Sequence, residues 1–180
     1  MESSQFDPSG FYEFDAASGA IKARGGQRVL VLSDALLAPL VAAAASSGDL
    51  TPLRTLGNGL GEHAKESLGG DAAGGTPEAV FSAASAVMSV FGWGRLEVER
   101  WGDALALRVE SLPALDERRL AAAALLGGLL SSLSGEEAAC VPVGEQFLVV
   151  HPEAADSVWK LARSGGSVAS IAASLQGGSR

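Results

Sequence analysis

Histidine and cysteine side chains are the usual metal ligands and nucleophiles of proteins, and this chain of 180 residues has two histidines and one cysteine. Cys140 lies in an apolar stretch with no neighbouring base, which predicts a buried, unreactive thiol. A structural zinc site normally has four ligands, so His63, His151 and Cys140 would need carboxylates to complete one. The sequence therefore predicts no metal site and no disulfide within the chain.

His63 is the candidate haem ligand or general base. No second ligand or positioned partner accompanies it, and a single histidine of this kind is usually a surface residue. The carboxylate pairs Glu136/Glu137 and Glu97/Glu99 are typical of solvated faces of acidic proteins. We therefore expect no catalytic residues and no cofactor, with haem binding left open as an alternative.

The pattern Gly57-x-Gly59-x-Gly61 resembles a phosphate-binding loop only superficially. Such a loop follows a strand and ends in Gly-Lys-Ser/Thr, whereas this pattern lies inside a helical repeat of leucines. Gly57 and Gly61 are four residues apart and so lie on one helix face, where they allow another helix to approach closely.

Aromatic and sulfur side chains gather near the end of one predicted helix. We expect four of them to line an apolar pocket for a small ligand: Phe81, Met88, Phe91 and Trp93. The alternative is that they fill the core, as most such residues do.

A glycine turn at Gly92 and Gly94 ends that helix, and two strands with alternating apolar residues follow around Gly102-Asp103. Further β-prone segments lie at 11–15, 20–32, 138–143 and 146–151, and helical patterns at 34–46, 51–68, 76–91, 115–133 and 152–163. Tight hairpins imply antiparallel pairing, so we predict an α+β fold with an antiparallel sheet of hairpins covered on one face by helices.

One domain is expected from the length. Residues 1–10 read as a lead-in, 11–163 as the ligand-binding-type domain, and 164–180 as a flexible or weakly docked tail, with a glycine-rich linker at 69–75. The helix at 115–133 is apolar on nearly every side, which favours burial on more than one face. We therefore expect a homodimer whose interface includes Leu125, Gly128 and Leu129.

Charge and hydropathy exclude several classes of partner. The net charge is −8, the sequence pI is about 4.7 and no basic run exceeds Arg118-Arg119, so we expect no nucleic-acid partner. The longest apolar stretches are about ten residues, too short to cross a bilayer. Without a recognisable signal peptide, a cytoplasmic location is expected.

Four segments together resemble the 4-vinyl reductase domain family: Leu56-Gly57-x-Gly59-x-Gly61, Phe91-Gly92-Trp93-Gly94, Leu125 to Leu130, and Glu136 to Val149. That family shares its fold with the Bet-type subunits of the TRAPP trafficking complex and is similar to haem-based nitric oxide sensors. The resemblance covers roughly residues 20–151. It implies a ligand-binding module, often dimeric, although Cys140 stands alone where many members carry several cysteines.

The leading hypothesis is a non-catalytic regulatory or scaffolding module of bacterial type that binds an apolar small molecule, a protein partner, or both. One alternative is a haem- or tetrapyrrole-binding protein or an enzyme of tetrapyrrole metabolism. Another is an interaction subunit of a small-GTPase or trafficking-like complex.

Overall fold

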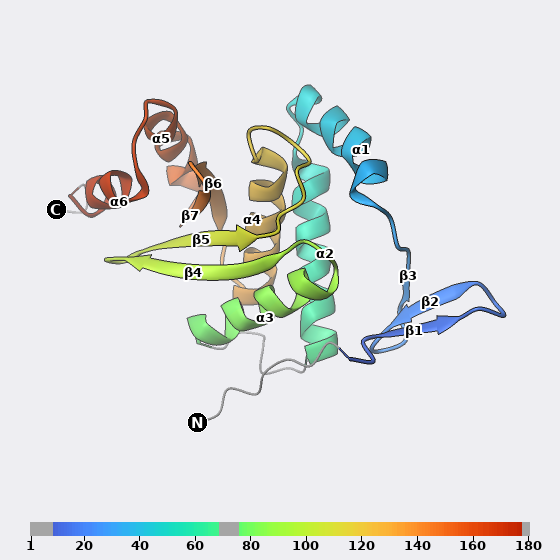
Figure 1. Cartoon of the computed structure of the whole chain (residues 1–180). Helices are drawn as coiled ribbons and strands as arrows, with labels where there is room; N and C mark the ends of the chain where they lie inside the picture. The colour runs from blue at the N-terminus through green and yellow to red at the C-terminus, as the bar shows by residue number, and fades with distance from the viewer. Residues whose placement is uncertain (1–8, 69–75, 178–180) are drawn as a thin grey trace.

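The computed structural model describes residues 9–68 and 76–177, and a four-stranded antiparallel sheet lies at its centre (Figure 1). The strand order is β4-β5-β7-β6, with every neighbouring pair antiparallel. The strands are β4 (Arg95–Trp101), β5 (Ala104–Glu110), β6 (Ala139–Val143) and β7 (Gln146–Val150). Both predicted hairpins and the α+β class are confirmed.

Helices lie on both faces of this sheet. Since successive residues of a strand point to opposite faces, neighbouring residues contact different helices. Leu107 and Phe147 face α2 (Thr51–Leu68), α3 (Pro77–Val90) and α4 (Leu120–Ser134), which form the larger core. Ala106 and Leu148, one position along, face α5 (Pro152–Arg163) and α6 (Val168–Gly177). The sequence predicted helices on one face of the sheet, and the structure has a second, smaller helical layer on the other face.

The tightest packing of the larger core is between α2 and α4, here called the seam. A Cβ atom at Gly57 would overlap the carbonyl oxygen of Leu125, and one at Gly128 would overlap the carbonyl oxygen of Arg54. Backbone therefore meets backbone in both directions, as the glycine spacing in α2 predicted. The guanidinium of Arg54 also donates to Ser131 Oγ at 3.0 Å, which adds a polar tie to the seam.

A second sheet of three strands lies to one side of this body (Figure 1). Its order is β1-β2-β3, formed by β1 (Tyr12–Asp15), β2 (Ala20–Ala23) and β3 (Arg28–Val29). Residues 30–33, here called the strap, lead from β3 into α1 (Asp34–Ser47). The helix predicted at 34–46 is α1, which has Ser33 as its N-cap and Gly48 as its C-cap and includes Pro39.

Two expectations about α4 need correction. It begins at Leu120 rather than at residue 115, because the Asp116 carboxylate accepts hydrogen bonds from the backbone N–H groups of Leu120 and Ala121 at 2.7 and 3.2 Å. Leu125, Gly128 and Leu129 are buried within one chain, mostly by the seam, so they are not available as a dimer face.

Two sequence-based expectations fall partly or wholly outside the described residues, namely the linker at 69–75 and most of the lead-in at 1–10. In the predicted tail, α6 places Val168 and Ile171 against α5 and the sheet. The division into lead-in, domain and tail stays a prediction. None of the helices in the described ranges is long and apolar enough to span a membrane.

Candidate ligand cavity

Two hollows meet at Trp93, an apolar cavity of about 470 Å³ and a polar cleft of about 790 Å³. Trp93, Pro113 and Leu115 line both of them. The loop that carries Pro113 and Leu115 therefore separates an apolar compartment from a polar one.

The turn after α3 fixes the position of Trp93. Its backbone N–H donates to the carbonyl oxygen of Met88 at 2.8 Å, which closes the helix. Gly94 has a φ of +96°, and a Cβ atom there would overlap the carbonyl oxygen of Glu110. Only glycine fits this approach to β5, so the Gly-Trp-Gly sequence holds the indole between the core and the two hollows.

The walls of the apolar cavity come from five parts of the chain: β1, the segment from the end of β3 through the strap to the start of α1, α2, the end of α3 with its turn, and the loop after β5. Apolar and aromatic side chains predominate among its lining residues, which are Tyr12, Val29, Leu30, Val31, Leu32, Asp34, Leu37, Leu56, Val90, Phe91, Gly92, Trp93, Pro113 and Leu115. A lining of this composition suits an apolar ligand with few hydrogen-bonding groups.

Few polar groups of this cavity are available to a ligand. The Tyr12 hydroxyl donates to the carbonyl oxygen of Val90 at 2.7 Å, and burial raises the pKa of this phenol. The indole N–H of Trp93 makes no hydrogen bond with any described residue and is not sealed in the core. Trp93 is therefore the side-chain donor that a ligand can use.

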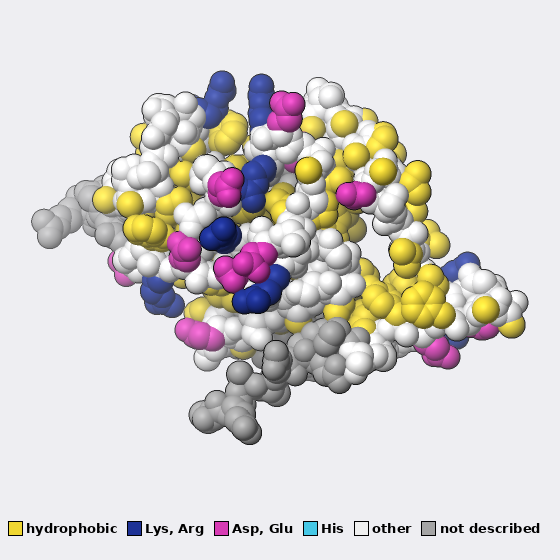
Figure 2. Space-filling view, viewed as in Figure 1, with side chains coloured by type: hydrophobic (Ala, Val, Ile, Leu, Met, Phe, Trp, Pro, Cys, Tyr) yellow, Lys and Arg dark blue, Asp and Glu magenta, His cyan; other side chains and the backbone are white. Residues whose placement is uncertain are grey.

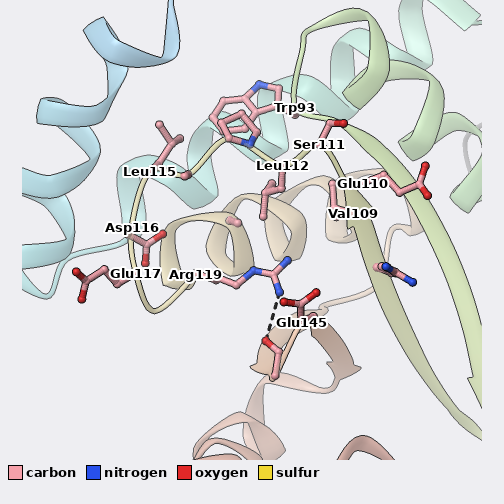
Figure 3. Close-up of a pocket in the computed structure, with 15 residues that line it drawn as sticks. Trp93, Val109, Glu110, Ser111, Leu112, Leu115, Asp116, Glu117, Arg119 and Glu145 are labelled. Atoms are coloured by element: carbon pink, nitrogen blue, oxygen red, sulfur yellow. Dashed lines mark hydrogen bonds between the residues drawn. The ribbon is translucent and has the colours of Figure 1, made fainter.

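The polar cleft is lined by the Pro113–Leu115 loop together with the charged residues Asp116, Glu117, Arg119 and Glu145 (Figure 3). Two of its charged side chains contact other parts of the chain. Asp116 caps α4, while Arg119 stacks over the Phe147 ring at 4.4 Å and donates to the carbonyl oxygen of Gly144 at 3.3 Å. Burial lowers the pKa of Arg119, opposed by Glu145 and Asp116, and a guanidinium stays charged under such conditions.

The structure separates the four residues that the sequence placed in a pocket. Phe91 and Trp93 line the apolar cavity, whereas Met88 is fully buried in the core and Phe81 packs against that core. Phe81 and Met88 therefore line neither hollow, and a ligand-binding role for all four residues stays a prediction.

His63 and Cys140 both lie away from the two hollows. His63 is buried rather than on the surface. Its Nδ1 is hydrogen-bonded to Gln27 Oε1 at 2.6 Å, and its ring stands edge-on to Phe91 with 5.2 Å between the ring centroids. Burial lowers the pKa of His63 and raises that of Cys140 to about 12. In the part of the chain that the structure describes, no group of three or more His, Cys, Asp or Glu residues could hold a metal ion.

Sequence reasoning missed Tyr12, Leu56 and the strap as cavity residues. The strap did carry a signal, because Val29 to Leu32 is a continuous apolar run beside a helix start rather than the alternating pattern of a half-buried strand. Tyr12 carried none, since only the fold brings β1 next to the end of α3.

Comparison with known proteins identifies a fold relative. No protein-family model matches this chain, and no curated protein matches it significantly in sequence. Among solved structures, it is similar to the phenol-responsive sensory domain of the transcription activator PoxR, whose structure was determined with phenol. The TM-score is 0.59 at 15% sequence identity, and the match covers 86% of this chain and 90% of that one. The chain therefore shares its fold with a sensory domain.

Proposed function

We propose that this chain is a non-catalytic sensory module that binds a small, largely apolar molecule, and that it acts as a homodimer. The observation that carries the proposal is the cavity of about 470 Å³ between the strap and the turn after α3. Its volume falls within the range of roughly 300–1,000 Å³ that is usual for small-molecule sites.

The kind of ligand follows from the lining. Tyr12, Phe91 and Trp93 supply aromatic faces, and the Trp93 indole offers one donor to a hydroxyl or carbonyl oxygen. A small aromatic molecule with one polar group fits this set. The likeness to the PoxR sensory domain, which responds to phenol, supports the same class of ligand.

Titration calorimetry with phenol, using benzene and cyclohexanol as comparison probes, tests the proposal. We expect phenol to bind, and Trp93→Phe to weaken its binding by about tenfold because the donor is lost while the ring remains. Trp159→Phe is the matched control, since Trp159 packs on the opposite face of the sheet. Absence of phenol binding, or equal weakening in both variants, contradicts the proposal.

The same fold supports a 4-vinyl-reductase-like assignment and a role in regulation, through a ligand-dependent contact with a partner protein. A cytoplasmic location stays part of this proposal. No feature of the structure favours the haem alternative, because His63 is paired with Gln27 and does not line the cavity. No feature of the described residues favours a small-GTPase or trafficking-like partner either.

A further inference from the structure

The strap carries apolar side chains that its own chain leaves uncovered. Leu30, Val31 and Leu32 are 78%, 70% and 57% exposed, although the same residues form one wall of the apolar cavity. The wall is therefore a single extended segment thick. In Figure 2, hydrophobic atoms continue along α1 beside an opening in the surface, and Leu36 and Leu40 add to this apolar area.

The strap also continues an edge strand. β3 pairs with β2 on one side, and no described residue pairs with its other side. The backbone of Leu30 to Leu32 makes no hydrogen bond with any described residue, and Ser33 is extended with φ −71° and ψ 155°. An edge of this kind, with apolar side chains, is a template for pairing with another strand.

Two residues of opposite charge lie at the same sequence separation on either side of Val31. Arg28 lies three residues before it and Asp34 three residues after it, and both are exposed without an ion pair to any described residue. If two such segments pair antiparallel around Val31, Arg28 of each copy faces Asp34 of the other. Leu30 then faces Leu32, and shifting the register by one or two residues places a charge opposite an uncharged residue.

We propose that the strap is the homodimer interface of this protein, formed by antiparallel pairing of two copies around a two-fold axis at Val31. The two three-stranded sheets then join into one across the axis. A two-fold interface uses the same patch on both subunits, which this charge pattern satisfies. The inference rests on the homodimer proposed above and adds that the partner copy completes the outer wall of the cavity.

A cysteine at the axis gives the sharpest test. Val31→Cys places two thiols opposite each other at a separation of about 4.5–5.5 Å between Cα atoms, which a disulfide can bridge. The buried Cys140 is the chain's own cysteine, so the background is low. Phe14→Cys is the matched control, because Phe14 is also 70% exposed but lies on β1, at the far edge of the same sheet. We expect mild oxidation to link most of the Val31→Cys protein and little of the control.

Charge reversal tests the register separately. Arg28→Asp places two like-charged pairs across the axis, so the dimer dissociation constant measured by sedimentation should rise by about tenfold or more. Adding Asp34→Arg restores opposite pairs and should return the constant to within about threefold of wild type. Circular dichroism of each variant confirms that the chain still folds.

Each outcome decides between the claims. A wild-type dimer with twice the 18.2 kDa mass of the chain, linked through residue 31 and rescued by the charge swap, supports the interface. A dimer that is not linked through residue 31 overturns the interface but leaves the homodimer standing. A wild-type monomer overturns both, whether or not phenol binds.

Discussion

The seam between α2 and α4 and the strap before α1 use apolar residues in opposite ways. In the seam, Gly57 and Gly128 bring two backbones together, and the leucines on either side of Gly128, Leu126 and Leu129, are fully buried within one chain. In the strap, consecutive apolar residues face a cavity on one side and the surface on the other. In the sequence, α4 and the strap both read as apolar stretches.

The contrast shows which apolar residues the fold itself accounts for. Burial stabilises the seam without help from outside, because each side chain removed from water lies against another part of the chain. The strap gains less from its own chain, and the proposed ligand on its inside and second copy on its outside would account for its apolar composition.

The largest change in stability is expected for a substitution that disrupts the seam. Gly57→Ala forces a methyl group against the carbonyl oxygen of Leu125, so the free energy of unfolding should fall by about 3 kcal/mol or more. Gly59→Ala, in the same helix with no atom within 4 Å, should instead stabilise the protein by roughly 0.5–1 kcal/mol. Urea denaturation of both variants measures the difference, and similar values for the two would contradict the close approach of the helices.

A smaller effect concerns the start of α4, the helix that forms one side of the seam. Asp116→Ala removes the acceptor for two backbone N–H groups and should cost about 1–2 kcal/mol in thermal or urea unfolding. Glu117→Ala, next to it and exposed, should change stability by less than about 0.5 kcal/mol. Equal losses would show that Asp116 does not cap the helix.

His63 connects α2 to the sheet that leads into the strap, through its contact with Gln27. Burial lowers its pKa in the folded chain, so between that pKa and the unfolded value of about 6.5 the unfolded state binds more protons. Stability should therefore decrease as the pH falls below about 6.5. His63→Gln should flatten this decrease relative to the wild-type chain. Stability measured across pH 5 to 8 checks the comparison, and an unaltered slope in His63→Gln argues against a buried neutral imidazole.

The smallest effect is expected in the strap itself. Leu32→Ser should change the unfolding free energy of the dissociated chain by no more than about 0.5 kcal/mol, because more than half of this side chain is already exposed. Leu133→Ser, at a fully buried position in α4, should cost several times more. Fluorescence-detected unfolding at low protein concentration measures both, and a loss of about 2 kcal/mol or more for Leu32→Ser would show that the strap packs against its own chain.

Local patterns in the sequence were sufficient for most of the fold. Alternation around Gly102-Asp103 predicted the first hairpin, the adjoining β-prone segments at 138–143 and 146–151 predicted the second, and the spacing of Gly57 and Gly61 predicted a close helix contact. The predicted start of α4 at residue 115 was wrong. The composition of residues 115–119 is compatible with a helix, but the Asp116 carboxylate bonds to the backbone N–H of Leu120, where the helix begins. The apolar character of helix α4 indicated burial correctly but could not show that the partner is α2 rather than a second subunit.

The candidate site was predictable only where it lies close in sequence to a turn. Phe91 and Trp93 follow directly from the end of α3, whereas Met88, one turn earlier, points into the core. Tyr12, Leu56 and the strap reach the cavity through tertiary contacts, which local patterns do not encode. Sequence reasoning therefore found one wall of the cavity and missed the others.

Native mass spectrometry of the wild-type protein mixed with phenol tests the central claim most directly, because one spectrum reports both subunit number and bound ligand. Our account predicts a species with twice the mass of one chain that gains the mass of phenol, and loses this gain in Trp93→Phe at the same concentration. A single chain without added mass, under conditions that preserve other noncovalent complexes, would contradict it.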